Sequence, residues 1–188
     1  MADLISIEDF KTYKKITKTD SDSELSLIIS SVSSLVKQYC GHSFIDYYTT
    51  AKEETFNIFP AQTAILLTEW PLKEVVSIST RDSYKEAYAT LDSAEYFADT
   101  ASDTVFMHTG YWPEGFGAVK VNYKAGYASV PQDVKIACLD LVNHYRKEEY
   151  TMRKSTGTSS IDNSSTNAGS PSKWPAHVVR VLDLHRNG

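Results

Sequence analysis

The sequence has few of the residues from which reactive sites are usually built. Only two cysteines occur among its 188 residues, Cys40 and Cys138, and neither stands in the spacing of a zinc site or a redox motif. We interpret both as buried free thiols in a reducing cytoplasm, with a disulfide as the alternative. Cys40 and His42 are two residues apart, but the local sequence lacks the partners that would complete a catalytic pair or a metal site. We therefore expect a buried thiol beside a surface histidine.

Motifs of catalysis and metal binding are also absent. The five histidines stand singly, and neither a G-x-S-x-G elbow nor a glycine-rich phosphate loop occurs. We expect His144 on the flank of a helix. Asp20-x-Asp22-x-Glu24 begins like a calcium loop, but Leu25 stands where that loop requires glycine, so helix capping is the better interpretation. We predict no catalytic residue, no cofactor and no metal, and hence a protein that is not an enzyme.

Long apolar runs and an excess of positive charge are missing as well. No apolar segment approaches the ~18 residues that cross a bilayer, and the first residues do not resemble a signal peptide, so we expect a soluble protein made in the cytoplasm. The net charge of −5 and the pI near 5.5 argue against a protein that holds nucleic acid by its phosphates. A wall past which DNA slides is still compatible with this charge.

Two stretches have the apolar period of a long helix. With 41% hydrophobic and 23% charged residues, the composition is that of a globular domain. From Leu25 to Cys40 apolar residues recur every three or four positions, and Gly41 is placed to end the helix. Pro131 begins a second such helix, which should reach about Tyr150. A short helix is expected after Ser6, ending near Ile16.

Between these helices, from about residue 44 to 128, the pattern changes to that of β-strands. Segments rich in β-branched and aromatic residues alternate with turn signals, and we predict strands at residues 53–59, 64–68, 75–80, 104–108 and 118–124. Residues 81–103 are polar and acidic, and we interpret them as a hairpin or loop with a short strand near Tyr96. The predicted fold is α+β, a small helical core of two long and two short terminal helices, with an antiparallel β-sheet inserted between the long helices.

A change of composition after residue 150 divides the chain into three predicted parts. Residues 1–150 form the core, residues 151–173 are rich in Ser, Thr, Asn and Gly and are expected to be a flexible linker, and residues 174–188 contain a short amphipathic helix. Because so short a helix is marginal alone, we expect it to dock on a partner. The candidate partner-binding residues are Trp174, Val178, Val179 and Leu182. On this interpretation, removing the chain from Thr151 onward leaves a folded core that no longer attaches.

Four stretches resemble the head-tail connector family of long-tailed phages, the adaptor or head completion proteins. They are residues 20–44, ending Tyr-Cys-Gly-x-x-Phe; residues 70–78, with Trp-Pro-Leu-x-x-Val; residues 111–127, from Tyr-Trp-Pro to Ala-Gly-Tyr; and residues 130–137, beginning Val-Pro-x-Asp-Val. Their order and spacing carry the resemblance over residues 20–150. The β region around 81–103 and the Ser/Thr/Asn-rich tail depart from the family's shortest members.

The resemblance implies a structural virion protein located at the neck. It implies a ring, usually of twelve subunits, that lies under the portal protein, continues the DNA channel and provides an attachment surface for a tail-side neck or terminator protein. Each subunit would contact the next, DNA would pass without specific binding, and no membrane would be involved. The alternative from the residues is a monomeric β-rich module that binds a protein or glycan through Trp112, Tyr111 and Tyr127. An enzyme whose residues converge only in three dimensions is a third possibility.

Overall fold

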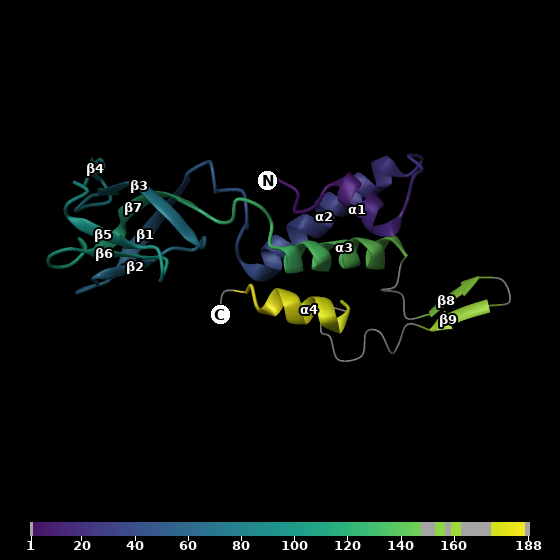
Figure 1. The fold of residues 1–188 in the computed structure, drawn as a ribbon. Helices are drawn as coiled ribbons and strands as arrows, with labels where there is room; N and C mark the ends of the chain where they lie inside the picture. Colours follow the sequence, from purple (N-terminus) through teal and green to yellow (C-terminus); the bar gives the residue numbers. More distant parts are fainter. Residues whose placement is uncertain (1, 148–152, 157–158, 163–173, 187–188) are drawn as a thin grey trace. The chain divides into compact units, whose positions relative to one another are not determined.

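The computed structural model describes residues 2–147, 153–156, 159–162 and 174–186 (Figure 1). Two compact units contain them. Residues 1–41 and 130–188 contribute to the first, the helical unit, and residues 42–129 form the second, the β unit. The chain therefore leaves the helical unit after its first long helix, forms the whole β unit, and then returns to the helical unit with its second long helix. This order matches the predicted insertion of β structure between the long helices.

In the part of the helical unit that the structure describes there are four helices: α1 (Ile7–Lys14), α2 (Asp22–Cys40), α3 (Gln132–Arg146) and α4 (Ala176–Asp183). Ser6 caps α1 through a reciprocal pair of hydrogen bonds with Asp9. Gly41 ends α2 in the left-handed conformation, as predicted. The predicted end of α3 near Tyr150 lies outside the described residues, and the helix as described ends at Arg146.

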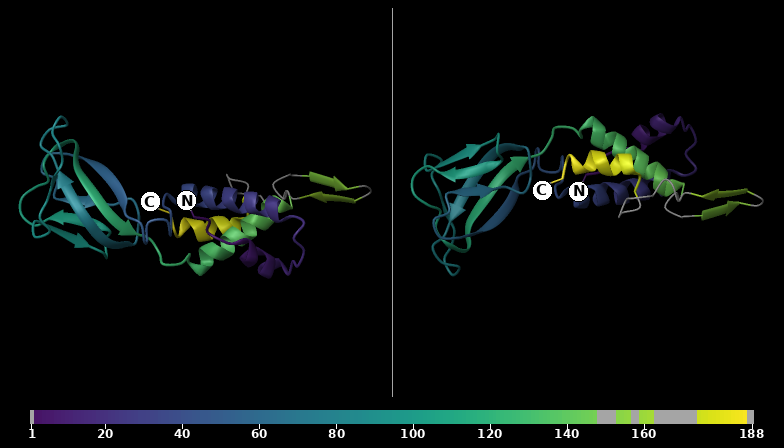
Figure 2. Two further views of the ribbon diagram at one scale, coloured as in Figure 1. Left: turned by 90° about the horizontal axis from the view of Figure 1, so that it is seen from above. Right: turned by 90° about the horizontal axis from the view of Figure 1, so that it is seen from below.

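The helices are held together by the apolar faces that the sequence predicted. Leu25, Ile29, Val32 and Val36 of α2 are at most 2% exposed, and α3 contributes its own buried stripe between Val134 and Val142. α2 packs along α3, and α4 packs against both, which the two views of Figure 2 show. No helix among the described residues is long and apolar enough to cross a membrane.

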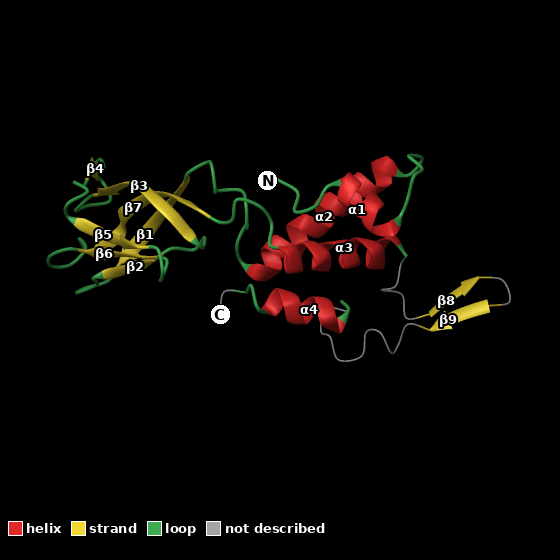
Figure 3. Cartoon of the chain, in the orientation of Figure 1, coloured by secondary structure: helices red, strands yellow, loops and turns green. Residues whose placement is uncertain are grey.

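Two antiparallel sheets form the β unit, where the sequence predicted one (Figure 3). The first has the order β1-β7-β3-β4, and the second has the order β2-β6-β5. The bounds are β1 (Lys52–Ile58), β2 (Ala64–Leu66), β3 (Leu72–Thr80), β4 (Ala89–Thr90), β5 (Tyr96–Asp99), β6 (Thr104–Met107) and β7 (Gly115–Ala125). The prediction of one sheet was incomplete because strand pairing joins residues far apart in the sequence, such as Lys52 with Tyr123 and Ile65 with Val105.

A single apolar core lies inside the β unit. Alternate residues of β7, Val119, Val121 and Tyr123, are fully buried, as their alternation with polar residues predicted. Ile65 and Val105 of the second sheet join the same core. The two sheets therefore bury one face each and leave their other faces outside.

The segment that the sequence predicted as a linker contains two short strands, β8 (Arg153–Thr156) and β9 (Ser159–Asp162). They pair as an antiparallel hairpin, with Arg153 opposite Asp162. The composition gave no signal for this hairpin. The remaining residues of the predicted linker lie outside the described part of the chain, so its flexibility stays a prediction.

Candidate assembly site

The four residues predicted to bind a partner lie on and just before α4, and three of them are buried within the helical unit. Trp174 is 7% exposed, and Val178 and Leu182 are fully covered, whereas Val179 keeps part of its surface. The indole N–H of Trp174 donates a hydrogen bond of 2.8 Å to the Tyr145 hydroxyl on the C-terminal part of α3. In this structure α4 covers the apolar surface of its own unit, and the docking of these residues on the portal or a neighbouring subunit stays a prediction.

Polar contacts at the edges of α4 hold it in the same place. The Tyr39 hydroxyl of α2 donates to the Asp183 carboxylate at 2.6 Å, and this contact raises the pKa of Tyr39 above its usual value. His185 lies 2.7 Å from Asp133 at the start of α3. Because these contacts join α4 to both long helices, removal of α4 would expose their core. The expectation that a chain truncated at Thr151 keeps a folded core stays a prediction.

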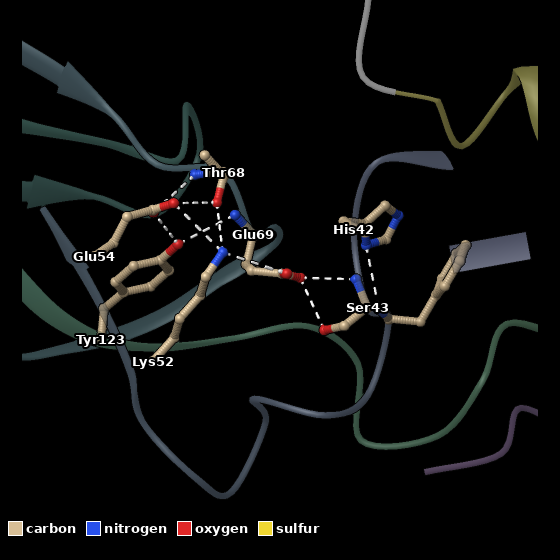
Figure 4. Close-up of polar contacts among 8 residues, drawn as sticks. His42, Ser43, Lys52, Glu54, Thr68, Glu69 and Tyr123 are labelled. Carbon is tan, nitrogen blue, oxygen red and sulfur yellow. Dashed lines mark hydrogen bonds and ion pairs between the residues drawn. The ribbon is translucent and has the colours of Figure 1, made fainter. Parts of the chain in front are cut away.

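A network of polar side chains in the β unit has the residue types of a catalytic site (Figure 4). The Glu54 carboxylate accepts hydrogen bonds from the hydroxyls of Tyr123, at 2.7 Å, and Thr68. Lys52 lies 3.4 Å from the same carboxylate and 3.5 Å from that of Glu69. Burial opposes the ionisation of Glu54, but hydrogen bonds from Thr68 and Tyr123 and the charge of Lys52 outweigh it and lower its pKa.

The same network continues to the loop after α2 and has a structural role there. Glu69 accepts two hydrogen bonds of 2.9 Å from Ser43, one from its backbone N–H and one from its hydroxyl. The Tyr123 hydroxyl accepts one from the Glu69 backbone N–H at 3.2 Å. Burial first, and then the hydrogen bond to Glu54, raise the pKa of Tyr123 well above its usual range, so it stays protonated. These groups satisfy one another and fasten the loop to the sheet.

Two histidines lie elsewhere than the sequence predicted. His42 is 3% exposed. Its ring centroid lies 4.1 Å from that of Trp70 and 4.0 Å from that of Phe44. The prediction of a surface histidine was wrong because the loop folds over Trp70, which is distant in the sequence. His144, predicted on the flank of α3, is 1% exposed and packs inside the helical unit.

The cysteines are free and buried, as predicted. Burial raises the pKa of both the Cys40 and the Cys138 thiols to about 12, so neither carries a thiolate at neutral pH. The Cys40 thiol instead approaches the Leu182 carbonyl oxygen at 3.7 Å. Within the described ranges, no three His, Cys, Asp or Glu side chains gather as a metal site would require.

The aromatic residues of the alternative binding module do not form an open platform. Trp112 is 2% exposed, and its indole N–H donates to the Thr63 carbonyl at 2.9 Å. It fills a corner of the β unit. Tyr111 is 62% exposed, but the buried indole beside it cannot stack on a ligand.

An exposed apolar surface that the sequence analysis missed lies on the outer face of the β2-β6-β5 sheet. Leu66 is 68% exposed and Phe97 is 57% exposed, and Phe106 is half-buried between them. Phe97 pairs directly with Phe106, so the two rings share one face of the sheet. The alternation of Phe97 and Phe106 with the inward Ala98 and Val105 was the available signal.

Comparison with known proteins gives consistent matches over nearly the whole chain. A family model described as head completion protein matches residues 3–188. The head completion protein of Escherichia phage T5 is 22% identical over 183 residues, which cover 97% of this chain and 98% of that protein.

Solved structures share the fold. A chain in the neck of an empty gene transfer agent particle, computed with C6 symmetry, superposes with a TM-score of 0.65 at 12% identity, covering 98% of this chain and 90% of that one. A chain in the neck of the native particle, computed with C12 symmetry, gives a TM-score of 0.60 at 12% identity, covering 100% of this chain and 94% of that one. The likeness therefore includes both the helical unit and the β unit.

Proposed function

Because the chain belongs to the head completion protein family, we propose that it assembles as a ring of twelve subunits beneath the portal of a phage head. As a member of this family it is a head-tail connector, a structural protein of the virion neck and not an enzyme. In the proposed ring the chain continues the DNA channel below the portal and presents its other side to a tail-side neck or terminator protein. Assembly takes place in the host cytoplasm.

The observation that carries the proposal is the family match over residues 3–188. The neck structures add support, because chains of the same fold occur there in particles described with C6 and C12 symmetry. A closed ring needs a head-to-tail contact in which each subunit uses one surface for one neighbour and a different surface for the other. A chain with two separate compact units has room for two such surfaces.

The charge of the chain suits a channel that DNA passes through without being held. A net charge of −5 offers no clustered excess of Lys and Arg over the whole chain for phosphate contacts. We also propose that the segment Trp174–Arg186 contributes to portal docking. Since Trp174, Val178 and Leu182 are buried, the contact would use the outer side of α4, where Val179 is partly exposed and Leu184 is 77% exposed.

The test is to mix the protein with the portal protein encoded in the same genome and to measure the mass of the complex by native mass spectrometry. We expect a complex that carries a fixed number of subunits matching the portal's symmetry, and this number gives the size of the ring. The protein alone is the control, because adaptor subunits can stay monomeric until the portal offers a template. If both proteins are folded and do not associate, the ring proposal is wrong.

A further inference from the structure

We propose that neighbouring subunits of the ring meet through the outer face of the β2-β6-β5 sheet of one copy and the N-terminal basic segment of the next copy. This inference rests on the proposed function and assigns the surfaces that the ring would use. The sheet face consists of Leu66, Phe97 and Phe106 with Glu95 and Asp99 beside them. The basic segment comprises residues 11–18, which include the end of α1 and the turn after it.

The apolar centre of the sheet face is placed there by strand register. Val105 pairs with Ile65 on one side and Ala98 on the other, and this row faces the core of the β unit. The alternating rows, which hold Phe97, Phe106 and Leu66, must therefore point outward. An antiparallel sheet that buries one face usually presents polar residues on the other. Exposed aromatic and leucine side chains at these positions are typical of a protein contact surface.

Acidic residues surround this apolar centre. Glu95 and Asp99 stand two residues before and after Phe97, on the same side of the strand. Residues 92–103, which include β5 and the turns on either side of it, contain four acidic residues and no lysine or arginine. Glu95 is exposed and Asp99 is partly exposed, and within the described part of the chain neither forms an ion pair. The partner of this face is therefore expected to be basic.

The chain itself carries such a partner on its other unit. Residues 11–18 contain four lysines and no acidic residue. Lys11 is paired with Asp22, but Lys15 and Lys18 are exposed and have no ion pair among the residues that the structure describes. Tyr13, 43% exposed, supplies an aromatic surface with the Lys14 ammonium 4.6 Å from the centre of its ring. The basic segment thus combines basic and apolar groups, whereas the sheet face combines acidic and apolar groups.

A second copy is the occupant that this charge pattern favours. A two-fold contact of the sheet face with itself would bring acidic residues against one another, and a contact with the DNA backbone would bring them against negatively charged phosphates. A head-to-tail contact pairs the acidic face with the basic segment and leaves one unused surface of each kind for the next neighbour, so that repetition closes a ring when the rotation between neighbours allows closure. The contact joins the β unit of one copy to the helical unit of the next.

Charge reversal on each side separates this contact from the alternatives. The acidic-face variant carries Glu95→Lys and Asp99→Asn, and the basic-segment variant carries Lys15→Glu and Lys18→Glu. Glu95, Lys15 and Lys18 are exposed, and no hydrogen bond of their side chains is part of the fold as described. Asparagine at position 99 removes the charge but can still accept the hydrogen bonds that Asp99 takes from Ser102 and from the Ala101 backbone. Glu114→Lys, an exposed change elsewhere on the β unit, is the matched control. Ring formation on the portal is measured by native mass spectrometry, and circular dichroism checks that each variant is folded.

Each two-site variant alone is expected to form rings at least about tenfold less than wild type, because like charges then face one another at every contact. The chain with all four changes should form rings again. The decisive sample is an equal mixture of the two variants: alternating copies restore opposite charges at every contact, so the mixture should assemble with equal numbers of each variant.

Three results would overturn the inference. Wild-type ring formation by either variant alone means that these surfaces do not meet in the ring. Failure of both the four-site chain and the mixture, with the chains folded, means that another protein occupies at least one surface. Recovery of the four-site chain but not of the mixture means that the two surfaces meet within one chain. In all three cases a wild-type ring on the portal leaves the proposed function standing, whereas a wild type that forms no ring removes the proposed function itself.

Discussion

Replacing Leu182 with alanine tests whether α4 belongs to the core of its own unit. The Leu182 side chain is fully buried at the point where α4 meets the long helices. Leu→Ala changes at buried sites cost about 2.7–5 kcal/mol, the lost transfer free energy plus the cavity that remains. We expect a loss of about 3 kcal/mol in the free energy of unfolding of the helical unit. Because the eight residues of α4 cannot form a stable helix alone, part of this loss should appear as release of α4.

The assay is urea unfolding followed by circular dichroism at a helical wavelength, together with hydrogen exchange of the α4 backbone amides. Leu184→Ala is the matched control, since Leu184 lies two residues further along and is 77% exposed. A surface change of this kind should alter stability by no more than about 0.5 kcal/mol. Equal, small effects of the two substitutions would refute the internal docking of α4 and return its apolar face to the role of a partner-binding surface.

Three further predictions concern the β unit and the thiols. Gly126→Ala should destabilise the β unit by about 3 kcal/mol or more, because Gly126 has a φ of +100° and a new Cβ would collide with the Phe44 carbonyl oxygen; unchanged thermal unfolding would contradict this. Glu54→Gln should lose stability at pH 7 relative to wild type, and the difference should shrink as the pH falls below about 4.3, because a carboxylate with a lowered pKa stabilises the fold only while ionised; a difference that is constant down to pH 3 in urea titrations would be evidence against it. Both thiols should react with a thiol reagent only after unfolding, since burial raises the pKa of each to about 12; rapid reaction of the native protein would show that the helical unit opens.

The elements that local patterns specify were predictable from the sequence. The apolar period of α2 and the stop at Gly41 follow from contacts and dihedral angles within a few residues, and the structure agrees with both. The alternation in β7 likewise placed Val119 and Val121 in the core. The family resemblance is confirmed by a family match that extends well beyond the four stretches that carried it.

Features that depend on distant residues were not predictable in this way. The burial of His42 depends on Trp70, and the division into two sheets depends on which strands pair. The pattern of α4 showed that one side must be covered, but an amphipathic helix carries no information about whether its cover is another protein or its own chain. The exposed row of Phe97 and Phe106 became a candidate surface once the register showed which side of the sheet is buried.

The interruption of the helical unit by the β unit sets the order in which the chain can fold during synthesis. The β unit has all of its strands once residue 129 has emerged, whereas the helical unit still lacks α3 and α4, which end at residue 183. At roughly 5–20 residues per second, those 54 residues take about 3–11 seconds to synthesise. During that interval the apolar stripe of α2, which includes Ile29 and Val32, lacks the cover that α3 and α4 later provide. The β unit can therefore fold while the helical unit is still incomplete, and the core of the helical unit closes only after α3 and α4 have been made.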